Sequence, residues 1–446
     1  MSEVPDGFRE VPVGPLPETW DVVSLGDVVS QRSERAGDRD LEVMSCSKIH
    51  GVILQSEKFK RRVASKNTAR YKVIRPGAFV YDSMLLWDGS IGRNNYDFAG
   101  VVSPAYYVFE ASPEVSGAFL ELLLRARPIM IPQYNRISEG TNRRRRKATF
   151  DDFVRIPVPF PPLPEQRAIA HVLRTVQRAR EATDGVIAAV RELKRSLMRH
   201  LFTYGPVPVG EAERVELQDT EIGAIPVDWE VVALGQAIKG TQYGTSIRAE
   251  STGKYPMLRM NNLVNGRVDT RDLKYIDLDD DELAKFKVNR GDVLFNRTNS
   301  FELVGKTSIF DLEGDYVFAS YLVRVIGDGR KLHPSYLNYF LNWQSAQDRL
   351  KQLATRGVSQ SNISATKLRG FNIGLPSLPE QREIARILSV ADAKIAAEEA
   401  RREALDGLFH SLLHHLMTGR IRTQGFQRQD ARTPSREEKN LGDFAT

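Results

Sequence analysis

Arginine, asparagine and glutamine side chains are concentrated in two stretches of this 446-residue chain. The first runs from residue 134 to residue 147 and includes four consecutive arginines followed by a lysine, and the second is the segment 356–362. These side chains carry the donor and acceptor pairs that match the edges of DNA bases, and arginine and lysine also bind phosphates. We therefore predict that both stretches contact DNA, although a basic run taken alone can also be a solvated segment. The candidate DNA-binding residues in these stretches are Asn135, Arg136, Asn142, Arg143, Arg144, Arg356, Ser359, Gln360 and Asn362, and we add Asn296 and Arg297 from the same half of the chain as the second stretch.

Three other motifs have residue types suited to catalysis or metal binding, but each lacks part of the required pattern. The segment 305–307, Gly-Lys-Thr, resembles the end of a phosphate-binding loop, yet Ser300 stands where that loop needs a glycine. The acidic run 277–282 could hold a divalent cation, and a solvated connection between a strand and a helix explains it as well. His410 and His414 are four residues apart without a His-Glu-x-x-His pattern. We therefore predict no catalytic residue and no metal site.

One stretch occurs twice and organises the chain. The sequence Leu-Pro-Glu-Gln-Arg stands at residues 163–167 and again at residues 378–382, 215 positions later. Proline is tolerated in the first turn of a helix, and a glutamate behind it complements the positive end of the helix dipole. Apolar residues then follow in alternating steps of four and three in both copies. The pattern predicts two helices of about 40 residues, roughly 60 Å long each.

The apolar positions of these helices form two seams of the kind that pack in coiled coils. The first seam runs from Ile169 to Leu201 and the second from Ile384 to Leu416. We predict that the two helices pack on each other as an antiparallel pair; the alternative is two unrelated amphipathic helices on separate domains. Where charged residues interrupt the seams, we expect aliphatic stems along the partner helix and exposed charged ends. These interruptions are Arg180, Lys194, Glu398 and Arg402.

The helix duplication is part of a larger repeat. Glycine, proline and valine positions around Trp20 recur around Trp229, so each half has a tryptophan-marked start, a globular stretch and a long helix. This repeat predicts an α+β fold with two domains of mostly antiparallel strands, related by a pseudo-twofold. The matching strand segments are 73–81 with 288–295 and 101–109 with 317–325, and the closing helices are 117–125 and 334–353.

Composition limits the class of protein. Lys and Arg number 63 against 57 Asp and Glu, a formal net charge of +6 that permits binding to nucleic acid. The single cysteine, Cys46, excludes an internal disulfide and a cysteine-based zinc site. We find no signal peptide at the start and no apolar run of membrane-spanning length, so we expect a cytoplasmic protein.

These patterns predict six segments along the chain. They are a first globular domain at 1–162, a first long helix at 163–204, a linker at 205–217, a second globular domain at 218–377, a second long helix at 378–422, and a flexible tail at 423–446.

The doubled arrangement of a Pro-x-x-Trp start, a variable domain and a Leu-Pro-Glu-Gln-Arg helix resembles the specificity subunit of type I restriction-modification systems. The resemblance covers residues 14–422, and the doubled helix motif is its specific mark. It implies that each variable domain is a target recognition domain for one half of a split DNA sequence, with the paired helices fixing the gap. A helix of about 60 Å spans on the order of 17 base pairs.

The resemblance also implies partners. In that family the subunit docks two methyltransferase subunits, which use S-adenosylmethionine to methylate one adenine on each strand, and a motor and nuclease subunit can join them. The sequence lacks the Asp/Asn-Pro-Pro-aromatic motif of such a methyltransferase, so we expect no cofactor on this chain. The candidate partner-docking and domain-anchoring residues are Leu163, Pro164, Glu165, Gln166, Arg167, Leu378, Pro379, Glu380, Gln381 and Arg382, although helix capping alone can explain the motif.

Two other functions remain open at this point. The first is an enzyme that recognises DNA and modifies or cleaves it by itself, against which the missing methyltransferase and nucleotide-binding motifs weigh. The second is a stand-alone DNA-binding or coiled-coil structural protein without methyltransferase partners.

Overall fold

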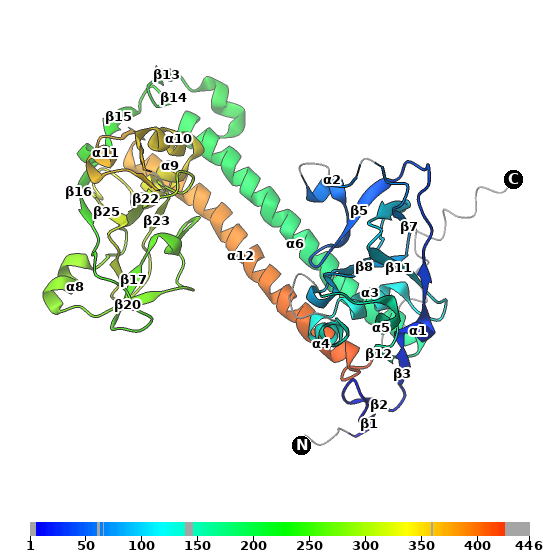
Figure 1. Cartoon of the computed structure of the whole chain (residues 1–446). Helices are drawn as coiled ribbons and strands as arrows, with labels where there is room; N and C mark the ends of the chain where they lie inside the picture. The colour runs from blue at the N-terminus through cyan, green and yellow to red at the C-terminus, as the bar shows by residue number, and fades with distance from the viewer. Residues whose placement is uncertain (1–5, 60–62, 66, 139–145, 358–359, 424–446) are drawn as a thin grey trace. The chain divides into compact units, whose positions relative to one another are not determined.

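The computed structural model describes residues 6–59, 63–65, 67–138, 146–357 and 360–423. The chain divides into two compact units, of which unit 1 comprises residues 1–182 and 401–446 and unit 2 comprises residues 183–400. The division falls inside both long helices, so each unit contains one α+β domain and a part of each helix (Figure 1).

The domain of unit 1 is built on two four-stranded sheets. Its elements are β1 (Phe8–Arg9), β2 (Leu16–Pro17), β3 (Asp21–Ser24), α1 (Leu25–Val28), β4 (Val29–Arg32), β5 (Glu42–Ser47), β6 (Gly51–Leu54), α2 (Gln55–Lys58), β7 (Lys72–Ile74), β8 (Phe79–Asp82), the 3-10 helix η1 (Leu86–Asp88), β9 (Ile91–Arg93), β10 (Gly100–Val102), β11 (Tyr106–Ala111), α3 (Gly117–Leu124), α4 (Arg127–Ile137), α5 (Phe150–Phe153) and β12 (Pro157–Phe160). The sheets have the strand orders β6-β5-β10-β7 and β4-β11-β8-β9, and β1-β2 and β12-β3 form separate pairs.

The domain of unit 2 is built on a six-stranded sheet. Its elements are η3 (Val209–Arg214), β13 (Leu217–Thr220), β14 (Gly223–Pro226), β15 (Glu230–Ala233), α7 (Leu234–Ala237), β16 (Ile238–Tyr243), β17 (Tyr255–Leu258), η4 (Met260–Asn262), β18 (Leu263–Val264), β19 (Gly266–Val268), β20 (Lys274–Ile276), α8 (Asp280–Phe286), β21 (Val293–Asn296), β22 (Thr298–Asn299), β23 (Thr307–Ile309), β24 (Val317–Phe318), β25 (Leu322–Gly327), α9 (Pro334–Asn342), α10 (Gln344–Leu353), β26 (Thr355–Arg356), β27 (Ser361–Asn362), α11 (Ala365–Arg369) and β28 (Asn372–Leu375). The main sheet runs β16-β25-β21-β23-β19-β18, beside the sheets β20-β17-β24 and β22-β27-β26 and the pairs β15-β28 and β13-β14.

The two domains share one arrangement of strands. The order β4-β11-β8-β9 in unit 1 is repeated as β16-β25-β21-β23 in unit 2. In both units the strand after the marker tryptophan pairs with the strand just before the long helix, β3 with β12 and β15 with β28. Most strand pairs are antiparallel, as expected, and β5 with β10, β17 with β24 and β19 with β23 are parallel. The internal repeat predicted from sequence is therefore present in the fold.

The closing helix of the second domain differs from the prediction. A single helix was expected over 334–353, but the structure has α9 and α10 in its place. Trp343 separates them with φ −65° and ψ 139°, an extended conformation. Its ring packs against Phe202 and Phe340 at centroid distances of 5.3 Å and 6.0 Å, so tertiary packing of the aromatic ring accompanies the break. The shorter helix of the first domain, α3, agrees with the prediction.

The long helices are α6 (Leu163–Tyr204) and α12 (Leu378–Met417), and they pack antiparallel as predicted. In unit 1, Arg180 of α6 pairs with Asp406 of α12 at 2.9 Å. In unit 2, Arg191 pairs with Glu399 at 2.5 Å and Lys194 pairs with Asp392 at 2.6 Å, so residue numbers rise along α6 as they fall along α12.

Arg402 is exposed, as expected, but the other three charged interruptions of the seams form ion pairs. Arg180 and Lys194 each meet a carboxylate of the other helix, and the Lys194 side chain is only 17% exposed. Glu398 is 6% exposed and pairs with Lys394 one turn away at 2.5 Å. If the charged ends of Arg180 and Lys194 pointed into solvent, Asp406 and Asp392 would be partly buried carboxylates without a positive partner, which is unfavourable.

The largest hydrophobic core of each unit combines its domain with both long helices. In unit 1, Trp20 and Phe79 of the domain pack with Leu173 of α6 and Leu416 of α12. In unit 2, the corresponding core joins Trp229 and Phe295 to Leu388 of α12 and to Leu201 and Phe202 of α6. Because burial of each such side chain contributes about 1.5 to 3 kcal/mol, the helices are integral parts of both units.

Candidate nucleic-acid interface

In unit 2, the predicted residues meet on the small sheet β22-β27-β26. Arg297 follows directly after β21, and its Nη2 donates to Oδ1 of Asn362 at 3.3 Å. The Asn362 amide in turn donates to Oγ1 of Thr298 at 2.8 Å. The Arg297 guanidinium lies over the Tyr243 ring at 4.9 Å, and this ring is 43% exposed. Arg297 and Asn362, far apart in sequence, therefore form one hydrogen-bonded surface.

Arg356 and Gln360 lie on the hairpin that joins β26 to β27. Both side chains are exposed, and the Gly357 N–H donates to the Gln360 carbonyl at 2.8 Å to close the turn. Arg356 lies over the Phe301 ring at 4.0 Å. A guanidinium stacked on an aromatic ring keeps its edge N–H groups available to bases or phosphates.

Asn296 lies inside the domain instead. Its side chain is 0% exposed, and neither amide atom has a hydrogen-bond partner among the described residues. A base contact by Asn296 would require the side chain to move, so its role in DNA binding stays a prediction. The neighbouring residue, Arg297, occupies the half-buried position next to the surface.

In unit 1, Asn135 and Arg136 lie near the end of α4. The Asn135 amide donates to the Ile131 carbonyl at 2.9 Å and accepts from Nη1 of Arg146 at 2.7 Å. Arg136 is exposed and donates to Gln133 at 2.7 Å. Asn135 is thus partly committed to its own helix, whereas Arg136 faces solvent. The other predicted residues, Asn142, Arg143, Arg144 and Ser359, lie outside the described part of the chain.

An arginine over an aromatic ring recurs in both units. Arg146 lies 5.9 Å from the centre of the Trp87 ring, and Arg356 lies over Phe301. Trp87 follows the end of β8 by five residues and Phe301 follows the end of β21 by five, so the two rings occupy equivalent positions. The aromatic partners were not predicted from sequence; an aromatic residue at the same distance from two matching strands was the available signal.

The glutamate of the repeated motif holds the marker tryptophan. Nε1 of Trp20 donates to Oε2 of Glu165 at 2.9 Å, and Arg422 binds the same carboxylate with both Nε and Nη2, at 2.8 Å and 3.0 Å. In the second copy, Nε1 of Trp229 donates to Glu380 at 3.4 Å. Each glutamate therefore ties the start of a long helix to its domain.

The glutamine of the motif is buried in both copies. Gln166 accepts from the Ser116 N–H at 2.9 Å, and Gln381 accepts from the His333 N–H at 2.7 Å. These are the residues immediately before α3 and α9, so the two glutamines bind equivalent points of the two domains. This geometry supports the domain-anchoring part of the expectation for the motif.

Other members of the motif face outward. Pro164 and Arg167 are exposed in the first copy, and Pro379 and Arg382 are exposed in the second. Leu163 and Leu378 are half-buried. Any contact with a partner at the motif itself is therefore restricted to one side of the first helical turn.

A match to a family model shows what kind of chain this is. The model for the type I restriction modification DNA specificity domain matches residues 17–192 and again residues 226–406. One match lies in each half of the repeat, and together they cover most of the sequence. The chain belongs to the type I restriction-modification specificity subunit family.

Curated specificity subunits match over different lengths. The MjaVIII specificity subunit of Methanocaldococcus jannaschii is 25% identical over 434 residues, 94% of this chain and 97% of that protein. The MjaX specificity subunit of the same organism is 32% identical over 202 residues, 45% of this chain and 48% of that protein. The EcoKI specificity subunit of Escherichia coli is 25% identical over 256 residues, covering 56% and 53%. The chain thus spans nearly all of the MjaVIII subunit and about half the length of the MjaX and EcoKI subunits.

Solved structures share the fold. The S subunit of a type I restriction-modification system from M. genitalium aligns with a TM-score of 0.56 and 12% identity, over 93% of this chain and 98% of that one. A chain from a study of complex assembly and conformational transition of the type I R-M system aligns with a TM-score of 0.53 and 18% identity, over 91% and 99%. At this identity the likeness establishes the architecture of a specificity subunit.

Two of the motifs that suggested other chemistry have structural roles in this specificity subunit. The segment 305–307 leads into strand β23, whereas a phosphate-binding loop needs a helix N-terminus at that point. Asp279 caps α8 by accepting from the Glu282 N–H at 2.8 Å, which accounts for part of the acidic run. Across the described residues, no group of three or more His, Cys, Asp or Glu side chains could hold a metal ion. The family is non-catalytic within the type I enzyme, as predicted.

No helix in the described part of the chain combines the length and the apolar character needed to cross a membrane.

Burial also acts on the carboxyl at the end of β8. Asp82 ends β8 and is 8% exposed, and burial raises its pKa above the ordinary value, while hydrogen bonds from backbone N–H groups, that of Met84 first, oppose the rise. The equivalent position at the end of β21 is Asn296, because the two strands pair with β11 and β25 in the same register. Unit 2 therefore has an uncharged side chain where unit 1 buries a carboxyl.

Proposed function

We propose that this specificity subunit recognises a bipartite DNA target, with one half-site bound by the domain of each unit. The observation that carries the proposal is the repetition of one construction in both units: the same strand order, the same tryptophan-glutamate contact, and an arginine over an aromatic ring after the same strand. A chain with two equivalent domains presents two equivalent sets of side chains, as recognition of two half-sites requires.

In unit 2, the base contacts are assigned to the surface formed by Arg297, Arg356, Gln360 and Asn362. Gln360 presents an exposed amide, which pairs with adenine through one donor and one acceptor. In unit 1, Arg136 and the segment 142–144 are the corresponding candidates. Lysine and arginine around these surfaces supply the phosphate contacts.

We further propose that the long helices dock two adenine methyltransferase subunits, which use S-adenosylmethionine, and that a motor and nuclease subunit can join the assembly. Leu193 of α6 and Leu408 of α12 are 215 residues apart and so occupy equivalent positions in the repeat. They are 54% and 46% exposed, whereas the other leucines of both helices are buried or half-buried. Two equivalent exposed leucines fit two copies of one partner.

The bipartite proposal is tested by changing one unit at a time. We expect Gln360→Ala to weaken binding at one half-site by about 1 to 3 kcal/mol, because a bidentate amide contact to a base is lost. Competition binding with DNA duplexes mutated in either half-site measures this loss. The matched control is Gln352→Ala, which removes an exposed glutamine from α10.

Two results would contradict the proposal. An equal loss on all DNA sequences would show that Gln360 contacts the backbone instead of a base. Equal effects of Gln360→Ala at both half-sites would show that unit 2 does not recognise a half-site of its own.

A further inference from the structure

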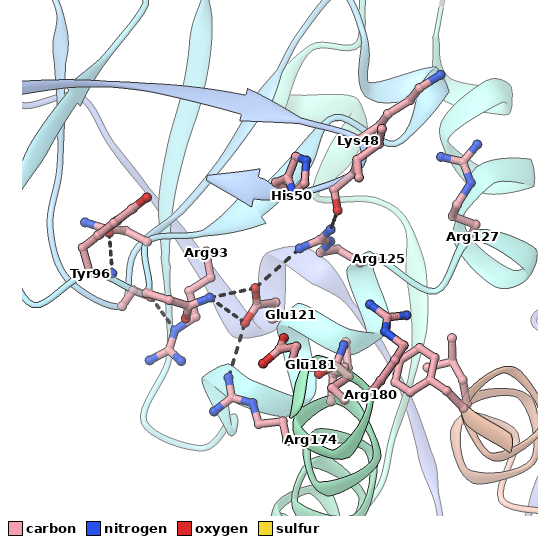
Figure 2. Close-up of a pocket in the computed structure, with 18 of the residues that line it drawn as sticks. Lys48, His50, Arg93, Tyr96, Glu121, Arg125, Arg127, Arg174, Arg180 and Glu181 are labelled. Atoms are coloured by element: carbon pink, nitrogen blue, oxygen red, sulfur yellow. Dashed lines mark hydrogen bonds and ion pairs between the residues drawn. The ribbon is translucent and has the colours of Figure 1, made fainter. Parts of the chain in front are cut away.

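Unit 1 contains a polar cavity of about 850 Å³ that none of the roles above uses (Figure 2). Its walls come from the turn between β5 and β6, from the end of β9, from α3, and from the parts of α6 and α12 that belong to unit 1. Phe409 and Leu413 of α12 supply apolar contacts, and most other lining groups are polar or charged.

The lining is dominated by positive charge. Six cationic side chains line the cavity, together with the two carboxylates of Glu121 and Glu181. Two further carboxylates pair with the cations from outside the lining: Asp88 with two of them, and Asp406 with one. Six positive charges therefore meet four negative ones, which leaves a positive excess. The lining cations are Lys48, Arg93, Arg125, Arg127, Arg174 and Arg180.

Glu121 organises the centre of this cluster. Its carboxylate accepts from Nη2 of Arg174 at 3.3 Å and from the Asn95 amide at 3.0 Å, and Nη1 of Arg125 lies 3.9 Å away (Figure 2). The Glu121 side chain is only 12% exposed. One partly buried carboxylate thus fixes guanidinium groups from α3 and α6 at the same cavity, before any ligand is present.

Arg93 has no carboxylate partner within ion-pair distance among the described residues. Its Nε donates to the Gly77 carbonyl at 3.2 Å, and its two Nη groups form no hydrogen bond within the described part of the chain. The guanidinium lies between Gly77 and Gly117, where a Cβ at either glycine would approach its nitrogen atoms to 3.3 Å. Burial lowers the pKa of Arg93, because the charged guanidinium is less favourable away from water. An anion bound in the cavity would stabilise that charge.

The equivalent cavity of unit 2 is smaller and its charges are balanced. It measures about 290 Å³. The repeat relates the two linings position by position, through the 215-residue offset of the helices and through the glutamine contacts at the starts of α3 and α9. Arg180 and Arg125 of unit 1 correspond to Ile395 and Asn342 of unit 2, and Gln177 corresponds to Asp392. Two cations are therefore replaced by neutral groups and one amide by a carboxylate, whereas Lys194 stands where unit 1 has Phe409. Three cations line the unit 2 cavity, Arg191, Lys194 and Arg195, and each is paired with a carboxylate, Glu399, Asp392 and Glu192 respectively, so no positive excess remains there.

We propose that the unit 1 cavity binds a phosphate group, carried either by the backbone of bound DNA or by a free nucleotide. Guanidinium groups converge on the cavity from β9, from the end of α3 and from α6, and each can donate two N–H groups. Together they suit a phosphate, which has several oxygen acceptors, better than they suit a carboxylate ligand, which has two. The DNA source rests on the proposed function, and the nucleotide source does not.

The test compares the full-length chain with its Arg93→Gln and Arg195→Gln variants. Arg195 lines the cavity of unit 2 and its side chain is 69% exposed, so its loss controls for the removal of one positive charge. The first arm measures binding of ATP without magnesium by calorimetry. The second measures binding of a duplex that lacks the target sequence at several salt concentrations. If Arg93→Gln lowers the melting temperature, Lys48→Gln replaces it, because the Lys48 side chain is 50% exposed.

Each arm identifies one source of the phosphate. For DNA, we expect Arg93→Gln to reduce the slope of log K against log salt by about 1, the loss of one phosphate contact, with no change for Arg195→Gln. For a nucleotide, we expect saturable ATP binding that Arg93→Gln weakens about tenfold. The inference is overturned if Arg93→Gln matches Arg195→Gln in both arms. Failure of the proposed function is a separate result, namely that the chain prefers no DNA sequence.

Discussion

The buried glutamine of the repeated motif is expected to hold each long helix to its domain. Gln381 is 0% exposed, accepts from the His333 N–H at 2.7 Å, and donates to the carbonyls of Lys331 at 2.9 Å and Pro376 at 2.8 Å. Its counterpart Gln166 binds two backbone groups. Substitution by alanine leaves these groups without a partner, three in the second copy and two in the first.

The expected cost follows from those contacts. A buried donor or acceptor left unsatisfied costs about 1 to 3 kcal/mol, and groups that water can reach fall at the lower end. The lost hydrogen bonds of Gln381→Ala should therefore cost unit 2 about 3 kcal/mol, and those of Gln166→Ala should cost unit 1 about 2 kcal/mol. A loss of 3 kcal/mol in local stability increases opening on the order of 100-fold.

Hydrogen exchange resolved by peptide measures this loss in each unit separately. Gln381→Ala should accelerate exchange in α9 and leave α3 unchanged, because α3 belongs to unit 1. Arg382→Ala is the control, since that exposed side chain is the next residue of the motif. Unchanged exchange in α9, or an equal change in the Arg382 variant, would refute the anchoring role of the glutamine.

Two further predictions concern buried charge. Since burial raises the pKa of Asp82, the folded state keeps its proton as pH rises from 3.8 while the unfolded chain loses it, and stability falls through that window. The Asp82→Asn variant should therefore have a higher melting temperature than the natural chain at pH 7, and the difference should shrink towards pH 4. The control variant Asp97→Asn changes an exposed carboxyl and should not show this difference. A difference in melting temperature that does not depend on pH would contradict the prediction. Lys194→Met should cost about 2 kcal/mol or more in urea unfolding, because Asp392 is only 12% exposed, whereas Arg191→Met removes a half-exposed pair and should cost less than about 1 kcal/mol. Equal losses would mean that burial of the first pair is unimportant.

The elements that follow from local sequence were predictable. Proline and glutamate at a helix start, followed by a regular apolar seam, predicted α6 with the bounds that it has, and alternation predicted the main strands of both domains. These signals are local, so they survive the divergence of the two halves.

Features that depend on tertiary packing were not predictable. The break at Trp343 accompanies ring packing against Phe202, a residue of α6 distant in sequence. The burial of Asn296 depends on the neighbouring strands, and asparagine is also a residue type that contacts DNA bases. The acidic partners of Arg180 and Lys194 lie on the other helix, so only the paired structure shows that the seams continue through ion pairs.

The same limit applies to the candidate interface. Arg297 and Asn362 were chosen from composition alone, and the structure shows that they are joined by a hydrogen bond. The ring of Phe301 beneath Arg356 had only a weak signal, its position five residues after β21 as Trp87 is five residues after β8, because a single phenylalanine in a divergent loop is more often part of a core.

The central claim is that this chain determines which DNA sequence a partner methyltransferase modifies. The most direct measurement is a methylome of cells that express the chain with its genomic neighbours, with and without this gene. We predict that one split motif with adenine methylation on both strands disappears when the gene is removed. If the partner methyltransferase is active and no motif changes, the chain does not set the target and the account is contradicted.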